Sequence, residues 1–547
     1  MFGDDSVAVK ILKRVSGTLI GCVPQSDRAI LISVFYLLFG AAAVVNAIPI
    51  IFQPDAYYVF TVARNLATGA GLTFDGVSIT TGFHPLWMGV TTAVYFLTRD
   101  IPIFQYSIYG LQTALFLAGH ALLFRVALRA GISIQAFLLV SIPVFIVHLN
   151  IFQEGLENTL SFFFLSLLLW LHTRDWNRRL TFAIVTSAVL VLIYLSRLDG
   201  AFLLALYLPW HFVREWRSGN LTSAVTLPTV VTASVLIHWL VMFAAFGTIF
   251  STSQMAINGY LSQIADTEGL ISWAHHPVTQ RMQDIVVAVN VWPETILRYL
   301  GLVIPASMLV AVYLVARKDI TQRMPLIFVG LMSLMQLTYY IVVFDGFMQP
   351  WYLTGWYIIV AFGGAFLLSS ILKKISIPMT TAVVVAGMIA FLAVDASRSH
   401  LGWTYFASRS ELLQEYSSED NILVGYSPDV VSFYGGVPIR HLQGLVNGYD
   451  FLRSYLLPRN LASYMSDIGA THFVGSNSRY IPTYVPCVAE LARDKDGPLI
   501  AYGIYDQHNS YVAVYRIIIT SEETPELVAG LDRECGPVIG SNTPGAG

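Results

Sequence analysis

The chain has 547 residues, of which 55% are hydrophobic and only 12% are charged, and its formal net charge is −3. A soluble globular protein carries about 25% charged residues, so the composition excludes a soluble cytoplasmic enzyme. The mean hydropathy of +0.63 excludes a disordered chain, and the slightly acidic balance argues against a nucleic-acid binder. Together these properties are typical of a protein that crosses a lipid bilayer several times.

Apolar segments close to the length of about 20 residues needed to cross a bilayer recur over the first 395 positions. One further apolar segment, 84–98, is only 15 residues long and starts with His84-Pro85, so we expect an interfacial helix that does not cross. The remaining segments predict eleven transmembrane helices, at 29–51, 105–128, 131–150, 157–173, 180–196, 200–215, 222–247, 295–316, 323–345, 351–372 and 376–395.

The distribution of basic residues fixes the expected orientation. If 84–98 stays outside the bilayer, 16 of the 21 Lys and Arg residues before residue 396 fall on one side, which the positive-inside rule assigns to the cytoplasm. The other side keeps only Arg64, Arg99, Arg197, Arg281 and Arg298. We therefore expect a cytoplasmic segment (1–28), an all-α transmembrane domain (29–395) and an extracytoplasmic domain (396–547).

Residues 396–547 carry 10 basic and 16 acidic residues and are more densely charged than the rest of the chain. Short apolar runs predict strands at 421–425, 471–475, 499–505 and 511–519. Helical patterns at 451–457 and 485–493 complete a small α/β domain. Cys487 and Cys535 lie in this domain and are disulfide candidates if it is exported, with buried free thiols as the alternative.

The first outer loop begins with an acidic residue, Asp55, directly after the first predicted span. Residues 56–68 fit an amphipathic helix on the membrane surface. One predicted face holds Tyr57, Thr61, Arg64 and Thr68, and another holds Tyr58, Val62 and Leu66. An ionisable residue at a membrane boundary is a functional candidate, whereas the alternative is that Asp55 only caps the helix.

The motifs of this loop resemble the first periplasmic loop of GT-C glycosyltransferases, which use polyprenyl-phosphate-linked sugars. They are similar in particular to the bacterial branch near the mycobacterial terminal arabinofuranosyltransferase. The matching residues are Asp55-Ala56-Tyr57-Tyr58, Ala63-Arg64-Asn65, Gly69, Gly71, Thr73-Phe74-Asp75-Gly76 and Thr81-Gly82-Phe83-His84-Pro85-Leu86-Trp87. The resemblance implies a GT-C fold and an enzyme that transfers a hexose or a pentose.

The resemblance also implies site roles. Asp55 corresponds to the acid that serves as general base, and His84 to a basic residue that contacts the donor phosphate in related aminoarabinose transferases. Tyr57, Tyr58 and Arg64 would support them. Many relatives carry an acidic pair where this chain has Pro54-Asp55, which weakens the case for a metal here. A divalent cation held by Asp55 and Glu157 remains an alternative, and no cofactor is certain.

Two more polar groups lie at the predicted outer boundary. Glu154 and Glu157 precede the span at 157–173, and the Gly155-Leu156-Glu157 unit resembles a family motif whose acid faces the site. A role in binding the acceptor or a cation competes with solvated loop acids. In the short 197–199 connection, Arg197 is expected to bind the donor phosphate, because its planar fork suits phosphate oxygens. An Arg197–Asp199 ion pair is the alternative, and both can hold together.

The leading hypothesis is an inverting membrane glycosyltransferase. It moves a sugar from a polyprenyl-phosphate donor to a glycan or lipid-linked acceptor at the outer leaflet, with no nucleic-acid partner. The alternatives are a protein O-glycosyltransferase such as an O-mannosyltransferase, a transporter or lipid flippase, and a scaffold that presents residues 396–547. Transporters place ionisable groups near the middle of the membrane, whereas the predicted polar groups gather at one face.

Overall fold

A computed structural model gives the fold of part of the chain. The predicted spans 29–51, 295–316 and 376–395, most of 131–150, and Cys487 and Cys535 lie outside the described residues. The described residues are 52–133, 136–137, 140–141, 154–174, 176, 178–253, 256, 320–342, 354–371, 410–418, 420–426, 428–442, 446–475, 488–495, 497–508 and 513–521.

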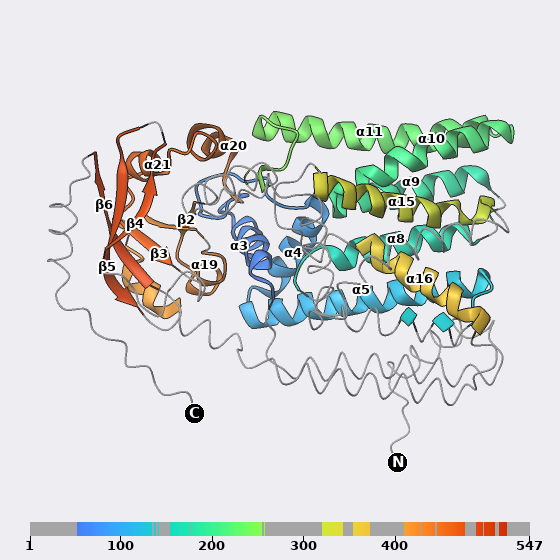
Figure 1. Cartoon of the computed structure of the whole chain (residues 1–547), viewed down its shortest axis with the longest axis horizontal. Helices are drawn as coiled ribbons and strands as arrows, with labels where there is room; N and C mark the ends of the chain where they lie inside the picture. Colours follow the sequence, from blue (N-terminus) through green and yellow to red (C-terminus); the bar gives the residue numbers. More distant parts are fainter. Residues whose placement is uncertain are drawn as a thin grey trace, which may run out of the picture.

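A bundle of apolar helices fills one side of the molecule (Figure 1). Its described helices coincide with predicted spans to within a few residues, and three of them, α5, α9 and α11, are long and apolar enough to cross a membrane. Their bounds are α5 Ile101–Arg129, α8 Asn158–His172, α9 Arg179–Ser196, α10 Ala201–Arg217, α11 Leu221–Phe246, α15 Ile320–Val342 and α16 Thr354–Ile371.

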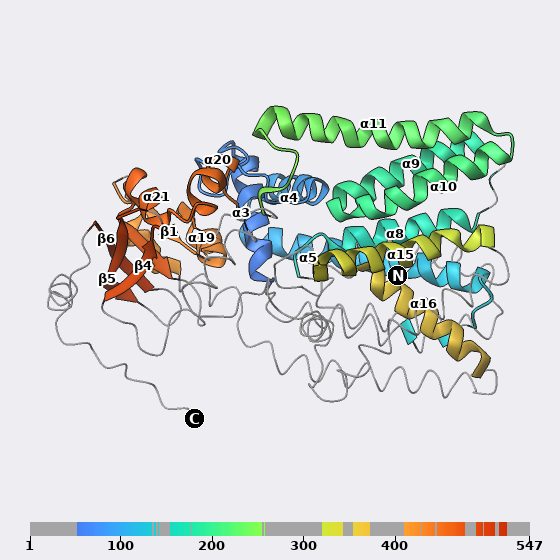
Figure 2. The same ribbon diagram turned by 45° about the horizontal axis from the view of Figure 1, so that its top comes forward.

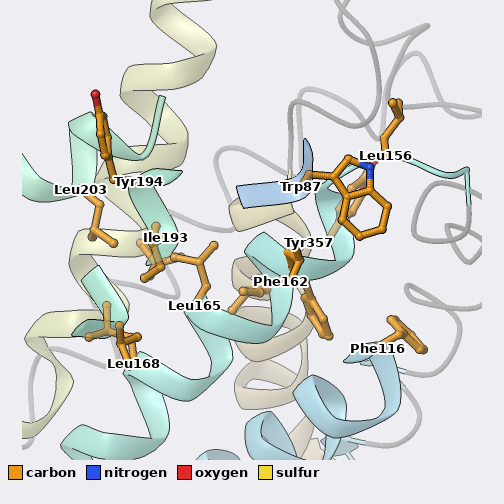
Figure 3. Close-up of a cluster of buried hydrophobic side chains, with 14 of the residues drawn as sticks. Trp87, Phe116, Leu156, Phe162, Leu165, Leu168, Ile193, Tyr194, Leu203 and Tyr357 are labelled. Atoms are coloured by element: carbon orange, nitrogen blue, oxygen red, sulfur yellow. The ribbon is translucent and has the colours of Figure 1, made fainter. Parts of the chain in front are cut away.

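Close packing of large side chains joins these helices. Phe116 of α5 stacks on Phe162 of α8 with ring centroids 5.5 Å apart. A Cβ on Gly119 would lie 2.7 Å from the Phe162 ring, so the two helices approach at this glycine. Figure 3 shows the same cluster extending from Trp87 and Leu156 at one end through Phe162 to Leu168. The core therefore reaches the turn before α8, which carries the predicted acids.

Two short helices, α3 (Pro54–Thr68) and α4 (Pro85–Thr98), lie between the bundle and the C-terminal region (Figures 1 and 2). Proline occupies the first position of each, where its missing N–H leaves no hydrogen bond unmade. Gly69 ends α3 in the left-handed conformation with φ 90°. At about 1.5 Å per residue, α4 is about 21 Å long, and it covers all but the first residue of the predicted segment 84–98.

The predicted amphipathic pattern of α3, with one polar and one apolar face, is wrong. Residues 56–63 are all buried, on every side of the helix, and Leu66 of the expected apolar face is 39% exposed. The cause is packing on two fronts, because α3 contacts α4 on one side and α19 of the C-terminal region on another. A helix enclosed by protein needs no polar face.

The C-terminal region contains a six-stranded sheet in the order β2-β1-β3-β6-β5-β4. β1 (Leu423–Gly425) pairs in parallel with β2 (Ile439–His441) and β3 (His472–Gly475). β6 (Ala513–Thr520), β5 (Ile500–His508) and β4 (Val488–Arg493) continue it antiparallel. The other elements are η5 Glu411–Tyr416, α19 Asp429–Gly435, α20 Tyr449–Phe451, the π-helix η6 Leu452–Leu456 and α21 Leu461–Asp467.

The expected α/β architecture and the four predicted strands are confirmed, and the helix predicted at 451–457 is seen as α20 and η6. The helix predicted at 485–493 is wrong, because residues 488–493 form strand β4. This segment is rich in Ala, Glu and Leu, which favour helices. Pairing with β5 along Val488–Arg493 overrides that local preference, which a sequence window cannot detect.

Specific contacts join the C-terminal region to α3 and to the segment that follows it. Asp75 accepts from the backbone N–H groups of Val77 and Ser78, and its Oδ2 lies 3.2 Å from Arg440 Nη1. His441 packs edge-on against Tyr58 at 4.9 Å between centroids. Burial lowers the pKa of His441 to about 3, so it is a neutral packing residue.

Candidate active site

Asp55 is the second residue of α3, whose start lies beside the turn before α8, because Gln53 N donates to Glu154 O at 3.1 Å. Its side chain is accessible to solvent. The cap position is held by Gln53, and no side chain caps this helix by a hydrogen bond, so the capping alternative is not supported. Among the residues that the structure describes, none donates a hydrogen bond to the Asp55 carboxyl or forms an ion pair with it. An accessible carboxylate without a partner is available to accept a proton.

The surroundings of Asp55 raise its proton affinity. Although solvent reaches the side chain, protein packed around it removes water, and this effect together with the negative charge of Glu157 raises its pKa to about 6. A base with this pKa is ionised at neutral pH yet still binds a proton with useful strength. The site therefore contains a carboxylate suited to deprotonating a hydroxyl group.

A buried ion cluster lies beside Asp55, centred on Arg197 between α9 and the 3-10 turn η1 (Leu198–Gly200). Arg197 is 4% exposed and forms a two-point pair with Asp199, with Nε to Oδ1 at 3.2 Å and Nη2 to Oδ2 at 3.0 Å. Its Nη1 donates to Glu157 Oε1 at 2.7 Å and to Asn158 Oδ1 at 3.3 Å. The predicted Arg197–Asp199 pair is confirmed, and Glu157 joins it.

His84, the residue immediately before α4, lies next to Glu157 of this cluster. Its Nε2 lies 3.4 Å from Glu157 Oε1, and its Nδ1 is buried without a hydrogen-bond partner among the described residues. Burial lowers the pKa of His84, although the charge of Glu157 opposes the shift. His84 therefore tends to be neutral, and when neutral it can donate one hydrogen bond but carries no charge.

Glu154 and Glu157 are not solvated loop acids. Glu157 is 5% exposed, and Glu154 accepts a hydrogen bond from Gln53 Nε2 at 3.3 Å while its Oε2 is buried and unpartnered among the described residues. Burial raises the pKa of Glu154 to about 8, and the charge of Asp55 contributes to the increase. Glu154 is therefore mostly protonated at neutral pH, so it can supply a proton donor next to Asp55.

The turn 154–157 is held by three helices. Trp87 Nε1 of α4 donates to Gly155 O at 2.8 Å. Gln112 of α5 accepts from Gly155 N at 3.2 Å and donates to Leu156 O at 2.7 Å. On the side of α3, a Cβ at Gly155 would lie 2.7 Å from Ala56 Cβ and 2.8 Å from the rings of Phe52 and Phe60. These contacts fix where Glu157 stands relative to Asp55.

We expect Gly155→Ala to destabilise the protein by about 1–3 kcal/mol, the range for forcing extra atoms into a packed site. Gly155 has φ +84° as well as the close contacts, so the variant adds backbone strain to steric overlap. Gly219→Ala is the matched control, because Gly219 has φ +77° but no atom within 4 Å of the added Cβ. Thermal unfolding of the detergent-solubilised variants measures the difference. Equal unfolding temperatures for both would contradict the tight packing of this turn.

The structure thus brings together Asp55, His84, Glu154, Glu157, Arg197 and Asp199, as their predicted shared location requires. Arg64 does not join them, because its Nη1 donates to Phe433 O of α19 at 2.8 Å. Tyr57 contacts Tyr434 OH at 3.1 Å. Sequence reasoning missed Asn158 and also Asp429, a buried acid of α19 whose pKa the charge of Asp55 raises. No local motif marks Asp429, because its proximity to α3 comes only from the tertiary fold.

The described residues contain no group of three His, Cys, Asp or Glu side chains arranged to hold a metal ion. Asp55 and Glu157 alone supply two carboxylates, and Glu157 is already paired with Arg197. The expectation of a divalent cation therefore gains no support from this geometry.

No protein-family model and no curated protein matches the sequence. Among solved structures, the chain is similar to ArnT from Cupriavidus metallidurans bound to undecaprenyl phosphate, with a TM-score of 0.52 and 12% identity over 90% of this chain and 98% of that one. The apo state of the same protein gives a TM-score of 0.51, 11% identity and coverage of 89% and 97%.

A weaker likeness is to the Archaeoglobus fulgidus oligosaccharyltransferase in complex with Zn and sulfate. It has a TM-score of 0.46 and 10% identity over 80% of this chain and 68% of that one. A TM-score of this size supports no argument about the chain. The likeness to ArnT shows that the chain shares the ArnT fold, and membership of the GT-C glycosyltransferases stays a prediction. The placement near the mycobacterial branch, the number of spans and the membrane orientation stay predictions.

Proposed function

We propose that the protein is a membrane glycosyltransferase that moves a sugar from a polyprenyl-phosphate donor to an acceptor hydroxyl. The observation that carries this proposal is Asp55, an accessible carboxyl with a raised pKa and no hydrogen-bond or ion-pair partner among the described residues, placed beside a buried cluster of Arg197, Glu157 and His84. The site lies where the apolar helices meet the C-terminal region (Figure 2). A donor with a lipid tail and a polar sugar suits this boundary, as does a fold shared with a protein bound to undecaprenyl phosphate.

The proposed reaction is a single displacement with inversion. The acceptor oxygen attacks the anomeric carbon of the donor while its proton passes to the Asp55 carboxylate. A new glycosidic C–O bond forms, the bond from the anomeric carbon to the phosphate oxygen breaks, and its electron pair leaves with the polyprenyl phosphate. Charge that develops on the leaving phosphate needs positively charged or hydrogen-bonding groups.

Arg197 and His84 are the proposed partners of that phosphate. The two-point pair with Asp199 holds the guanidinium in place, while Nη1 faces Glu157 at the side of the cluster nearest His84. We propose that the donor phosphate takes hydrogen bonds from His84 and from Arg197 Nη1. Glu157, displaced from Nη1, would then orient the acceptor together with protonated Glu154.

The sugar and acceptor follow the sequence resemblance. We propose a pentofuranose donor, as in the branch near the mycobacterial terminal arabinofuranosyltransferase, and a glycan or lipid-linked acceptor at the outer face of a bacterial cytoplasmic membrane. The experiment uses the full chain in sealed vesicles of known orientation that contain a polyprenyl-phospho-arabinofuranose. A membrane-impermeant glycan acceptor added outside should be glycosylated only by right-side-out vesicles, with an inverted anomeric configuration. Absence of transfer from arabinose, mannose and aminoarabinose donors alike would contradict the proposal.

The fall of kcat at low pH should follow the protonation of Asp55. Its pKa is about 6, and the base must be deprotonated to act, so kcat should be constant above that pH and fall about tenfold per pH unit well below it. Transfer rates measured at saturating substrate across the pH range test this. A rate that rises as the pH falls through the same range would exclude a carboxylate base.

A further inference from the structure

The segment that leads into His84 is fixed by hydrogen bonds at two buried threonines. Thr80 and Thr81 are at most 2% exposed. The Thr80 hydroxyl accepts from Gly82 N at 3.1 Å, and Phe83 N donates to Thr81 O at 2.8 Å. Local bonds between hydroxyl and backbone groups stabilise tight turns. The chain therefore turns just before His84, and the position of His84 depends on where Thr81 is held.

The segment that follows α11 contacts Thr81 directly. Thr81 Oγ1 donates to Thr252 Oγ1 at 3.2 Å and accepts from Thr252 N at 3.2 Å. Ser251 Oγ donates to Thr81 O at 3.2 Å. Thr252 is 1% exposed, so the loss of one of these bonds leaves a buried polar atom without a partner. We call these three hydrogen bonds the threonine clasp.

The threonine clasp lies between two other parts of the molecule. Gly247 ends α11 in the left-handed conformation with φ 72°, and Figures 1 and 2 show the chain after α11 turning toward α3 and α4. Beyond the clasp, Ala256 is fully buried in the same hydrophobic cluster as Leu442 of the C-terminal region. On the other strand of the clasp, a Cβ added to Gly448 would lie 2.9 Å from Ile79 O. The clasp therefore joins α11, the segment before α4 and the C-terminal region.

The His84 ring has few polar contacts of its own. Its Nε2 lies 3.4 Å from Glu157 Oε1, and its Nδ1 has no hydrogen-bond partner among the described residues. A separation of 3.4 Å is long for a hydrogen bond, so this contact holds the ring only weakly. The backbone that carries His84 therefore decides where the ring stands, and that backbone is attached to α11 through Thr81.

We propose that the threonine clasp positions His84 for the donor phosphate, so that Thr81 and Thr252 are positioning residues that act through His84. The inference rests on the proposed function, in which His84 donates a hydrogen bond to that phosphate. A donor group contributes fully to binding only when it is held at the right place. Loss of the clasp should therefore weaken the binding of a polyprenyl phosphate.

The test is the dissociation constant (Kd) of undecaprenyl phosphate for the detergent-solubilised full chain. His84→Ala should raise this Kd about tenfold, as expected for the loss of a hydrogen bond to a charged group. Thr81→Val keeps a similar shape but removes the hydroxyl, and we expect a Kd about threefold higher than that of the parent, because the ring is misplaced but present. Thr81→Ser keeps the hydroxyl and should restore the Kd of the parent.

The lipid without its phosphate separates a phosphate contact from general damage. Undecaprenol has the same tail and no phosphate, so its Kd should be the same for the parent, His84→Ala and Thr81→Val. Thr252→Val removes one bond of the clasp and keeps the Thr252 N–H, so it should raise the Kd of undecaprenyl phosphate by less than Thr81→Val does.

A double substitution shows whether the clasp acts through His84. In His84→Ala, the further change Thr81→Val should leave the Kd of undecaprenyl phosphate unchanged, whereas an independent structural role would add its own effect. Thr91→Val is the matched control, because Thr91 is fully buried and its hydroxyl donates to Trp87 O and Met88 O within α4. It should bind undecaprenyl phosphate as the parent does.

Two results would overturn the inference while leaving the proposed function in place. One is a Kd of undecaprenyl phosphate that is the same for Thr81→Val, Thr252→Val and the parent. The other is a threefold further loss of binding when Thr81→Val is added to His84→Ala. Absence of sugar transfer by a parent protein that shows all the expected binding results would overturn the proposed function alone.

Discussion

Asp55→Asn should abolish transfer and leave the protein folded. Asparagine cannot accept the proton of the acceptor, so kcat should fall by about a hundredfold to ten-thousandfold, the range that general acid–base catalysis contributes. No described residue depends on the Asp55 carboxyl for a hydrogen bond, so folding should not suffer. Product formation from a polyprenyl-phospho-sugar, measured with the purified variant, checks the first part.

Thermal unfolding checks the second part. Burial raises the pKa of Asp55 to about 6, above its ordinary value of about 4. The stability linked to its protonation is therefore present at low pH and lost as the pH rises through about 6. At about pH 8 the uncharged variant should unfold at a temperature no lower than the parent.

Asp450→Asn is the control for activity, because Asp450 is an exposed first-turn acid of α20 outside the site. Near-normal turnover by Asp55→Asn would exclude Asp55 as the base.

Arg197→Gln should have the largest effect on stability. The substitution leaves Glu157 and Asp199 in a buried cluster without their cation, and Glu157 is only 5% exposed. Breaking a buried ion pair by removing one partner costs about 3–5 kcal/mol. The expected result is a markedly lower unfolding temperature and a loss of transfer.

A second substitution separates charge from shape. In Arg197→Gln, the further change Glu157→Gln removes one uncompensated charge and should recover part of the lost stability. Arg440→Gln is the control, because Arg440 pairs with Asp75, which keeps hydrogen bonds from Val77 and Ser78. It should lower stability by only about 1 kcal/mol. An unfolding temperature of Arg197→Gln equal to that of the Arg440→Gln control would show that the cluster is not required for folding.

Much of the fold could be predicted because the information was local. The seven described bundle helices and the short α4 are runs of apolar residues long enough to be recognised singly. The link between Arg197 and Asp199 also follows from sequence, since the two residues are separated by one position. These features depend on composition and spacing within about twenty residues.

The rest depended on contacts between distant segments. Burial of α3 on all sides needs α19, and the strand at 488–493 needs β5. The proximity of Asp429 to Asp55 could not be predicted for the same reason, because only the packing of α19 on α3 brings them near each other. The raised pKa of Glu154 likewise comes from the protein that encloses it, and a loop acid in a sequence gives no sign of that enclosure.

The uninterrupted burial of residues 56–63 has a consequence for how this segment tolerates change. A helix on a surface tolerates substitutions with a periodicity of three to four positions, because only one side of the helix faces water. Saturation mutagenesis of α3 should show no such periodicity: every position of its first two turns should be restrictive, and tolerance should begin only near the exposed Leu66 and Thr68. Evolution of this loop is then confined to paired changes with the helices that enclose it.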